Sequence, residues 1–144
     1  MAHASESAQI DRPIAEVFDF LADGTTNALW RSGIVSISKA SGDGVGAVYR
    51  QRLNGPMGRQ IDGDYRITAF DRPTRIAFEV IAGPARPTGT YELRELSPTS
   101  TAVTFSLNLE PRGLAKLMAP MISRQMEREV AAIHQLKAVL EKPT

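Results

Sequence analysis

The chain has 144 residues, enough for one domain with a substantial core and too few for two ordinary domains. Its 17 basic and 16 acidic residues leave a formal charge of +1, which argues against nucleic acid or an anionic membrane as the main partner. The absence of cysteine excludes disulfides, a thiolate nucleophile and a cysteine-ligated metal. No segment resembles a transmembrane helix, and the polar first ten residues lack a signal-peptide core, so we expect a cytoplasmic protein without stable membrane insertion.

The N-terminal part predicts one strand and two short helices. Weak alternation over residues 4–10 favours a first strand. Asp11 followed by Pro13 is typical of a helix start, and Asp23-Gly24 ends that helix. A second helical piece is expected over residues 25–30, ending at Trp30, the single tryptophan.

From Ile34 onward the apolar residues recur with a period of two, which is typical of strands. Turn-forming residues rich in Gly, Pro, Asp and Ser separate the segments. The strands are predicted over residues 34–40, 47–54, 61–69, 76–81, 88–96 and 103–109. Short hairpin connections imply an antiparallel sheet, and the one-sided alternation implies that one face is covered.

Residues 112–141 predict one long amphipathic helix that covers this face. Its apolar residues project within about 40° of one direction: Met118, Ile122, Met126, Ile133, Leu136 and Leu140. Pro120 requires either a bend or a helix start at that point, with residues 113–119 forming a separate turn. The predicted fold class is therefore α+β: a single domain over residues 1–144, with a curved antiparallel sheet of about seven strands wrapped around a long C-terminal helix, and two short helices between strands 1 and 2.

This order of elements resembles the helix-grip fold of the START-like, birch-pollen-allergen-like superfamily, and within it the bacterial polyketide cyclase/dehydrase and lipid-transport group. The residues that carry the resemblance are Ile10–Pro13 with Val17-Phe18, Trp30, Gly44–Gly46, Phe70–Phe78, Leu136-Lys137 and Leu140-Glu141. The resemblance implies an internal hydrophobic cavity between the helix and the sheet. Some relatives are enzymes and many only bind a ligand, so it implies no single set of catalytic residues.

Glu129 is the candidate catalytic residue. It projects about 20° from the centre of the apolar stripe, where an unpaired carboxylate is costly to bury. Facing a cavity, it would have a raised pKa suited to general acid or base chemistry. The alternatives are a shifted helix phase, or a carboxylate that reaches an arginine or the rim.

Candidate ligand-binding residues come from the inward strand faces and from the helix. Phenol and amide groups of Tyr49, Gln51, Tyr65 and Tyr91 are placed to orient a ligand oxygen, although tyrosines also pack in cores with their hydroxyls on backbone partners. Trp30 either lines the cavity or plugs the core. On the helix, Met118, Ile122 and Met126 form either an adaptable apolar wall or ordinary core.

Other chemistries find little support. Arg50 and Arg52 fall on the outer face, where they can pair with Asp62 and Asp64. The two histidines, His3 and His134, lack partners at metal-ligand spacing, and no nucleophile elbow or phosphate loop occurs, so we expect no metal and no cofactor.

The leading functional hypothesis is a binding protein for a small hydrophobic or aromatic molecule, present as a monomer or homodimer and independent of nucleic acid. A cyclase/dehydrase-like enzyme that uses Glu129 or a cavity tyrosine is the second hypothesis, so enzymatic activity stays open. The third is an interaction or chaperone-associated module, which a fully packed interior would favour.

Overall fold

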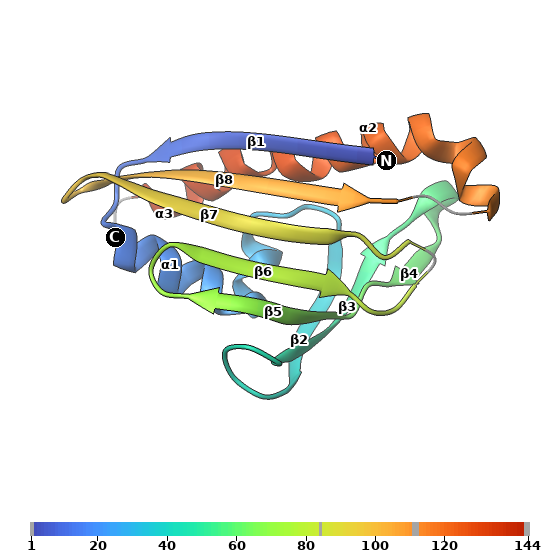
Figure 1. Ribbon diagram of the computed structural model, residues 1–144, viewed down its shortest axis with the longest axis horizontal. Coiled ribbons are helices and arrows are strands. Elements are labelled where there is room, and N and C mark those ends of the chain that lie inside the picture. The colour runs from blue at the N-terminus through green and yellow to red at the C-terminus, as the bar shows by residue number, and fades with distance from the viewer. Residues whose placement is uncertain (1, 84, 111–112, 143–144) are drawn as a thin grey trace.

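A computed structural model describes residues 2–83, 85–110 and 113–142 (Figure 1). In chain order the elements are β1 (Ala2–Ile10), α1 (Ile14–Ala22), η1 (Gly24–Leu29), β2 (Ile34–Ser41), β3 (Val48–Asn54), η2 (Pro56–Gly58), β4 (Gln60–Asp62), β5 (Tyr65–Asp71), β6 (Arg75–Val80), β7 (Thr88–Ser97), β8 (Ser100–Leu109), η3 (Gly113–Met118), α2 (Ala119–Ala131) and α3 (Ile133–Leu140), where η denotes a 3₁₀ helix. The predicted α+β helix-grip architecture is confirmed.

All strands belong to one antiparallel sheet with the order β1-β8-β7-β6-β5-β3-β2, and β4 pairs with β3. The run predicted as a single strand over residues 61–69 is divided into β4 and β5. Gly63 and Asp64 separate the two, since the backbone N–H of Gly63 donates to the carbonyl of Gln51 and the Asp64 carboxylate accepts from the Gln51 N–H at 3.1 Å. Gly63 is also required by space, because a Cβ there would lie 2.5 Å from Leu53 Cδ1.

The C-terminal helix begins at Ala119 with Pro120 in its first turn, which confirms the second of the two alternatives predicted at Pro120. The preceding residues 113–118 form the separate turn η3, and residue 112 lies outside the described residues. The helix tightens at Ala132, whose N–H donates to the carbonyl of Glu129, three residues back. None of the helices in the described ranges is long and apolar enough to cross a membrane.

The helix α2–α3 packs against β1 and β8 and runs along the concave side of the sheet (Figure 1). The apolar stripe supplies the buried residues Met126, Ile133 and Leu136, together with Val130. Met118 does not join this stripe, because it precedes α2 in η3, where the 3₁₀ geometry changes the direction of the side chain. The interior of the protein therefore lies between this helix and the face of the sheet that carries the tyrosines.

Candidate functional site

A ladder of aromatic rings occupies the inner face of the sheet. Neighbouring strands contribute one ring each: Tyr49 from β3, Tyr65 from β5, Phe78 from β6, Tyr91 from β7 and Phe105 from β8. Successive ring centroids lie 5.1, 5.4, 5.9 and 4.7 Å apart, within the range of favourable aromatic contacts. The period-two pattern thus brings one aromatic residue per strand onto a single surface.

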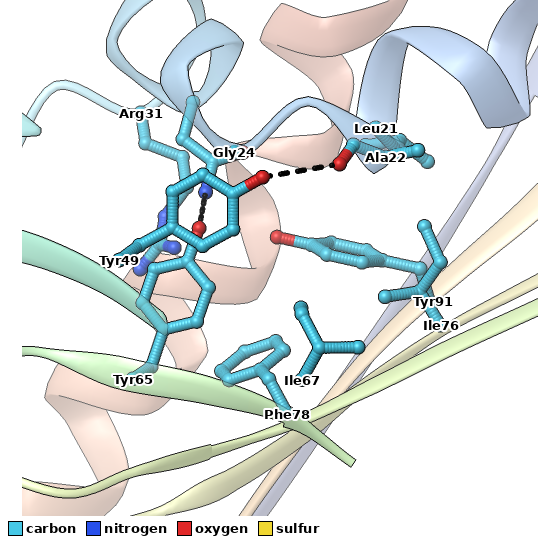
Figure 2. A pocket seen from close by; sticks show the side chains of 11 residues that line it. Leu21, Ala22, Gly24, Arg31, Tyr49, Tyr65, Ile67, Ile76, Phe78 and Tyr91 are labelled. Atoms are coloured by element: carbon cyan, nitrogen blue, oxygen red, sulfur yellow. Dashed lines mark hydrogen bonds between the residues drawn. The ribbon is translucent and has the colours of Figure 1, made fainter. Parts of the chain in front are cut away.

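These rings nearly fill the expected internal space. The remaining cavity measures about 10 Å³, about the room of one water molecule. Its lining comes from the end of α1, from η1 and from the ladder: Leu21, Ala22, Gly24, Asn27, Arg31, Tyr49, Tyr65, Ile67, Ile76, Phe78 and Tyr91 (Figure 2). A ligand larger than water can enter only if part of this lining moves.

The cavity is polar for its size. Asn27 Nδ2 donates to Tyr65 Oη at 3.2 Å, and Tyr49 Oη donates to the carbonyl of Ala22 at 3.4 Å, a long hydrogen bond for a hydroxyl. Five buried side-chain polar atoms have no hydrogen-bond partner among the described residues. Three of them belong to residues that line the cavity, Asn27 Oδ1, Arg31 Nε and Tyr91 Oη, and the other two, Trp30 Nε1 and Gln51 Oε1, belong to residues outside its lining. Figure 2 shows the Tyr91 hydroxyl pointing from its strand toward Tyr49 and Tyr65.

Burial sets the protonation state of the tyrosines. It raises the pKa of Tyr91 to about 12, although the Arg31 guanidinium acts in the opposite direction. Burial is also the main cause of the raised pKa of Tyr65. Both phenols are therefore neutral near pH 7 and keep a proton to donate.

Arg31, two residues beyond the end of η1, joins the cavity to the long helix. Its Nη2 lies 2.6 Å from Glu129 Oε2, and the two side chains are only 9% and 22% exposed. The guanidinium also packs over the rings of Trp30 and Phe105, at 6.0 and 5.6 Å. Burial lowers the pKa of Arg31, but the charge and hydrogen bond of Glu129 help to raise it overall, so the guanidinium stays charged.

The structure brings together only some of the sequence-predicted site residues. Tyr49, Tyr65 and Tyr91 border the cavity. Gln51 faces inward, but its Nε2 donates to the Gly63 carbonyl at 2.8 Å, and Trp30 is buried against Tyr91 and Phe105. Of the helix residues, Met126 is buried in the core, Ile122 is half-buried and Met118 is exposed. The lining of the cavity includes neither Gln51 and Trp30 nor any of the predicted helix residues, Met118, Ile122, Met126 and Glu129.

Sequence reasoning missed Asn27 and Arg31. A signal for them existed, since Asn27, Trp30 and Arg31 are spaced i, i+3 and i+4 and so share one side of a helical turn. Their role depends on the fold, which places η1 across the inner face of the sheet.

Other parts of the structure give weaker support for a functional site. An open hollow of about 270 Å³ lies beside β2, β3 and β4. The predicted charge pairing is present there in part, with Arg52 Nη1 2.7 Å from Asp62 Oδ1, whereas the Asp64 carboxylate accepts from the backbone N–H of Gln51. Within the described ranges, no group of three or more His, Asp or Glu side chains is placed to hold a metal ion. His134 is exposed, as its helix phase predicts.

Gly24 fixes how closely η1 approaches the ladder. A Cβ at this position would lie 2.3 Å from Tyr65 Oη and 2.7 Å from Tyr49 Cε1. We therefore expect Gly24→Ala to lower the free energy of unfolding by about 1–3 kcal/mol through overpacking, measured by urea denaturation. Gly33→Ala is the matched control, since its nearest atom lies at 3.6 Å. Equal effects of the two substitutions would contradict this close approach.

The family model described as polyketide cyclase / dehydrase and lipid transport matches residues 1–141. Among curated proteins, no sequence matches the chain. A START superfamily protein from Mycobacterium smegmatis is similar in structure, with a TM-score of 0.76 at 11% identity and 98% of each chain covered.

Two further solved structures show the same fold. The Zhui aromatase/cyclase from Streptomyces sp. R1128 has a TM-score of 0.72 at 18% identity, over 96% of this chain and 88% of that one. The di-domain ARO/CYC protein BexL from the BE-7585A biosynthetic pathway has a TM-score of 0.75 at 18% identity. This chain is covered to 99% in that comparison but spans only 50% of the di-domain protein.

Proposed function

Since the chain belongs to the polyketide cyclase / dehydrase and lipid transport family, we propose that it binds a small, mainly apolar molecule bearing an oxygen atom in the interior between the sheet and the long helix. The observation that carries this proposal is the set of three buried polar atoms without partners around one cavity: Asn27 Oδ1, Arg31 Nε and Tyr91 Oη. Each such atom costs about 1–3 kcal/mol when left unsatisfied, so a purely structural core has little reason to keep three together.

The chemistry of these atoms describes the ligand. Arg31 Nε and the neutral Tyr91 hydroxyl are donors, which suit a carbonyl or hydroxyl oxygen, and Asn27 Oδ1 is an acceptor for a ligand hydroxyl. The surrounding aromatic ladder favours a flat, aromatic body. A small hydroxy- or keto-aromatic molecule fits both requirements.

Ligand entry requires the site to expand, because about 10 Å³ does not hold an aromatic ring. We propose that η1 is the moving element. It covers the ladder through Gly24 and Asn27, and the Asn27–Tyr65 hydrogen bond of 3.2 Å is long enough to be exchanged for one to the ligand. Arg31, held by Glu129, anchors the end of η1 during this movement.

Tyr91→Phe tests the site directly. With β-naphthol as probe, we expect this substitution to reduce affinity about tenfold, the equivalent of one buried hydrogen bond, while the affinity for naphthalene stays unchanged. Trp30 fluorescence supplies the measurement, since the indole ring lies 6.1 Å from the Tyr91 ring. Equal binding of the two probes by the native chain would contradict the polar recognition.

The neighbouring donors Arg31 and Tyr91 favour one enzymatic alternative. Two donors on a single carbonyl oxygen stabilise an enolate, as a cyclase/dehydrase requires. Glu129 then acts as a positioning residue for Arg31, or as the base if the pair opens. Exchange of the α-protons of β-tetralone in heavy water distinguishes an enzyme from a carrier. In an enzyme, Glu129→Gln abolishes this exchange and leaves the affinity for β-tetralone nearly intact. In a carrier, the same substitution has only a small effect on binding.

The nearly filled interior favours the third hypothesis, an interaction module that works through the sheet surface. Native mass spectrometry of the purified chain separates it from the other two. A retained small molecule supports the binding proposal. No retained molecule, together with no response of Trp30 to either probe, would leave the interaction module as the better explanation.

A further inference from the structure

Exposed apolar side chains gather at one end of the molecule. The segments η2 and η3 both lie at the right-hand end in Figure 1, although more than fifty residues separate them in the sequence. The exposed fractions are 98% for Met57 in η2, 82% and 45% for Leu117 and Met118 in η3, and 49% for Met121 in the first turn of α2. Four large apolar residues at one end are more than scattered exposure on a surface normally supplies.

Met57 adds a second observation. It has φ 60° and ψ 28°, the left-handed conformation that glycine or asparagine adopts at lower cost. The side chain is almost fully exposed, so no packing within the described residues offsets this cost. A strained backbone that holds a long apolar side chain out into solvent points to a role outside the folded core.

Basic side chains border the same end. Arg59 directly follows η2, and Lys116 lies within η3. On α2, Arg124 and Arg128 are exposed and share the outward face with Met121 at spacings of three and seven residues. Glu127 projects about 100° from the centre of that face. Glu110, directly after β8, is an exposed carboxylate at the same end, so Arg59, Lys116 and Arg124 still leave a local excess of positive charge that the formal charge of +1 for the whole chain conceals.

We propose that this end docks reversibly on the surface of an anionic lipid bilayer. Met57, Leu117 and Met121 enter the interfacial region, and the neighbouring basic side chains meet the headgroups. The apolar side chains match the acyl boundary of such a bilayer, and the surrounding positive charges match its anionic headgroups. The contact is peripheral, because no helix among the described residues is able to cross the membrane.

A second copy of the chain is a poorer occupant. A two-fold dimer through this end would place like charges of Lys116 and Arg124 close to their own counterparts. The patch also comes from two small projections, whereas a stable protein interface takes about 20–30 residues from each partner. Charge complementarity therefore favours the bilayer.

Co-sedimentation of the full chain with vesicles tests the proposal. We expect binding to vesicles of phosphatidylcholine and phosphatidylglycerol and little binding to phosphatidylcholine alone. Lys116→Gln combined with Arg124→Gln reduces the partition coefficient about fivefold per residue removed. Leu117→Ser combined with Met121→Ser reduces it about tenfold or more, because apolar insertion is lost.

Matched controls come from other parts of the sheet. Val35→Ser with Val45→Ser removes two exposed apolar side chains from β2 and the loop that follows it, and Arg75→Gln with Arg94→Gln removes two exposed charges from β6 and β7. Both controls are expected to bind vesicles like the native chain. Equal losses in test and control variants, or no binding of the native chain to anionic vesicles, would overturn the proposal. So would self-association in light scattering that disappears with Leu117→Ser and Met121→Ser.

This outcome is independent of the interior site. β-Naphthol binding, followed through Trp30 in the absence of lipid, is expected to be the same in all four double variants, each checked for native circular dichroism. Loss of vesicle binding with intact probe binding is thus specific to the docking end.

Discussion

Glu129→Ala is expected to lower the free energy of unfolding by about 3 kcal/mol, because it leaves the Arg31 guanidinium buried without its counter-charge. This value is at the lower end for a buried pair, since Glu129 is 22% exposed and solvent screens part of the interaction. Urea denaturation at neutral pH supplies the measurement. The exposed Arg52–Asp62 pair is the control, and Asp62→Ala is expected to change stability by about 1 kcal/mol or less.

The cost in Glu129→Ala comes from the orphaned charge rather than from lost packing, and a double variant separates the two. Arg31→Met combined with Glu129→Leu removes both charges and keeps apolar volume, so we expect its stability to recover most of the loss. A double variant as unstable as the sum of its single changes would show that the two side chains act independently. In that case the pair would not be the anchor of η1.

The inward positions of Tyr49, Tyr65 and Tyr91 were predictable because strand side chains alternate with a fixed period of two. The helix phase likewise placed Glu129 on the side that faces the protein. The alternative in which this carboxylate reaches an arginine is confirmed, but the identity of the arginine was not predictable, because Arg31 approaches from a segment about a hundred residues earlier in the chain. Such a contact depends on how η1 crosses the sheet, and local periodicity carries no information about that crossing.

The size of the cavity was equally hidden from the sequence. A curved sheet and a covering helix predict a space, but its volume depends on whether the rings point across it or lie along it. Here the ladder from Tyr49 to Phe105 reduces the space to about 10 Å³. The position of Met118 was also wrongly predicted from regular helical spacing. It lies in a 3₁₀ turn and not in the α-helix, so its side chain does not join the apolar stripe.

Arg31 links the buried polar cluster to the proposed movement of η1, because it belongs to the cavity lining and also pairs with Glu129. The cluster of Asn27, Tyr65 and Tyr91 is held between two elements, and the ion pair with Glu129 fixes only the end of η1. Asn27 in η1 contacts the ladder through its 3.2 Å hydrogen bond to Tyr65, and Thr26 Oγ1 ties the start of η1 to α1 by donating to the Phe20 carbonyl at 2.7 Å. Opening near Gly24 and Asn27, with Arg31 as the fixed point, would expose the unpaired atoms to a ligand without breaking the pair.

The buried phenols predict a marked loss of stability in alkali. The pKa of Tyr91 is about 12 in the folded chain against 10.0 for an ordinary tyrosine. The contribution of its neutral phenol to the stability of the folded chain is therefore fully present below pH 10. Above that pH the unfolded chain releases the proton while the folded chain retains it. Stability therefore falls by about 2 kcal/mol as the pH rises to 12. The raised pKa of Tyr65 adds to this fall.

Tyr91→Phe isolates the contribution of one phenol. We expect the fall in unfolding free energy between about pH 9 and pH 12 to be smaller by about 2 kcal/mol in this variant, measured by urea denaturation at each pH. At neutral pH its stability should equal or exceed that of the native chain by about 1 kcal/mol, because a buried hydroxyl without a partner is removed. Ile76→Val, a change in the same lining without a titrating group, should lower stability equally at every pH. An unchanged alkaline slope in Tyr91→Phe would mean that water reaches this hydroxyl, and the site would then lack the desolvated donor on which ligand recognition depends.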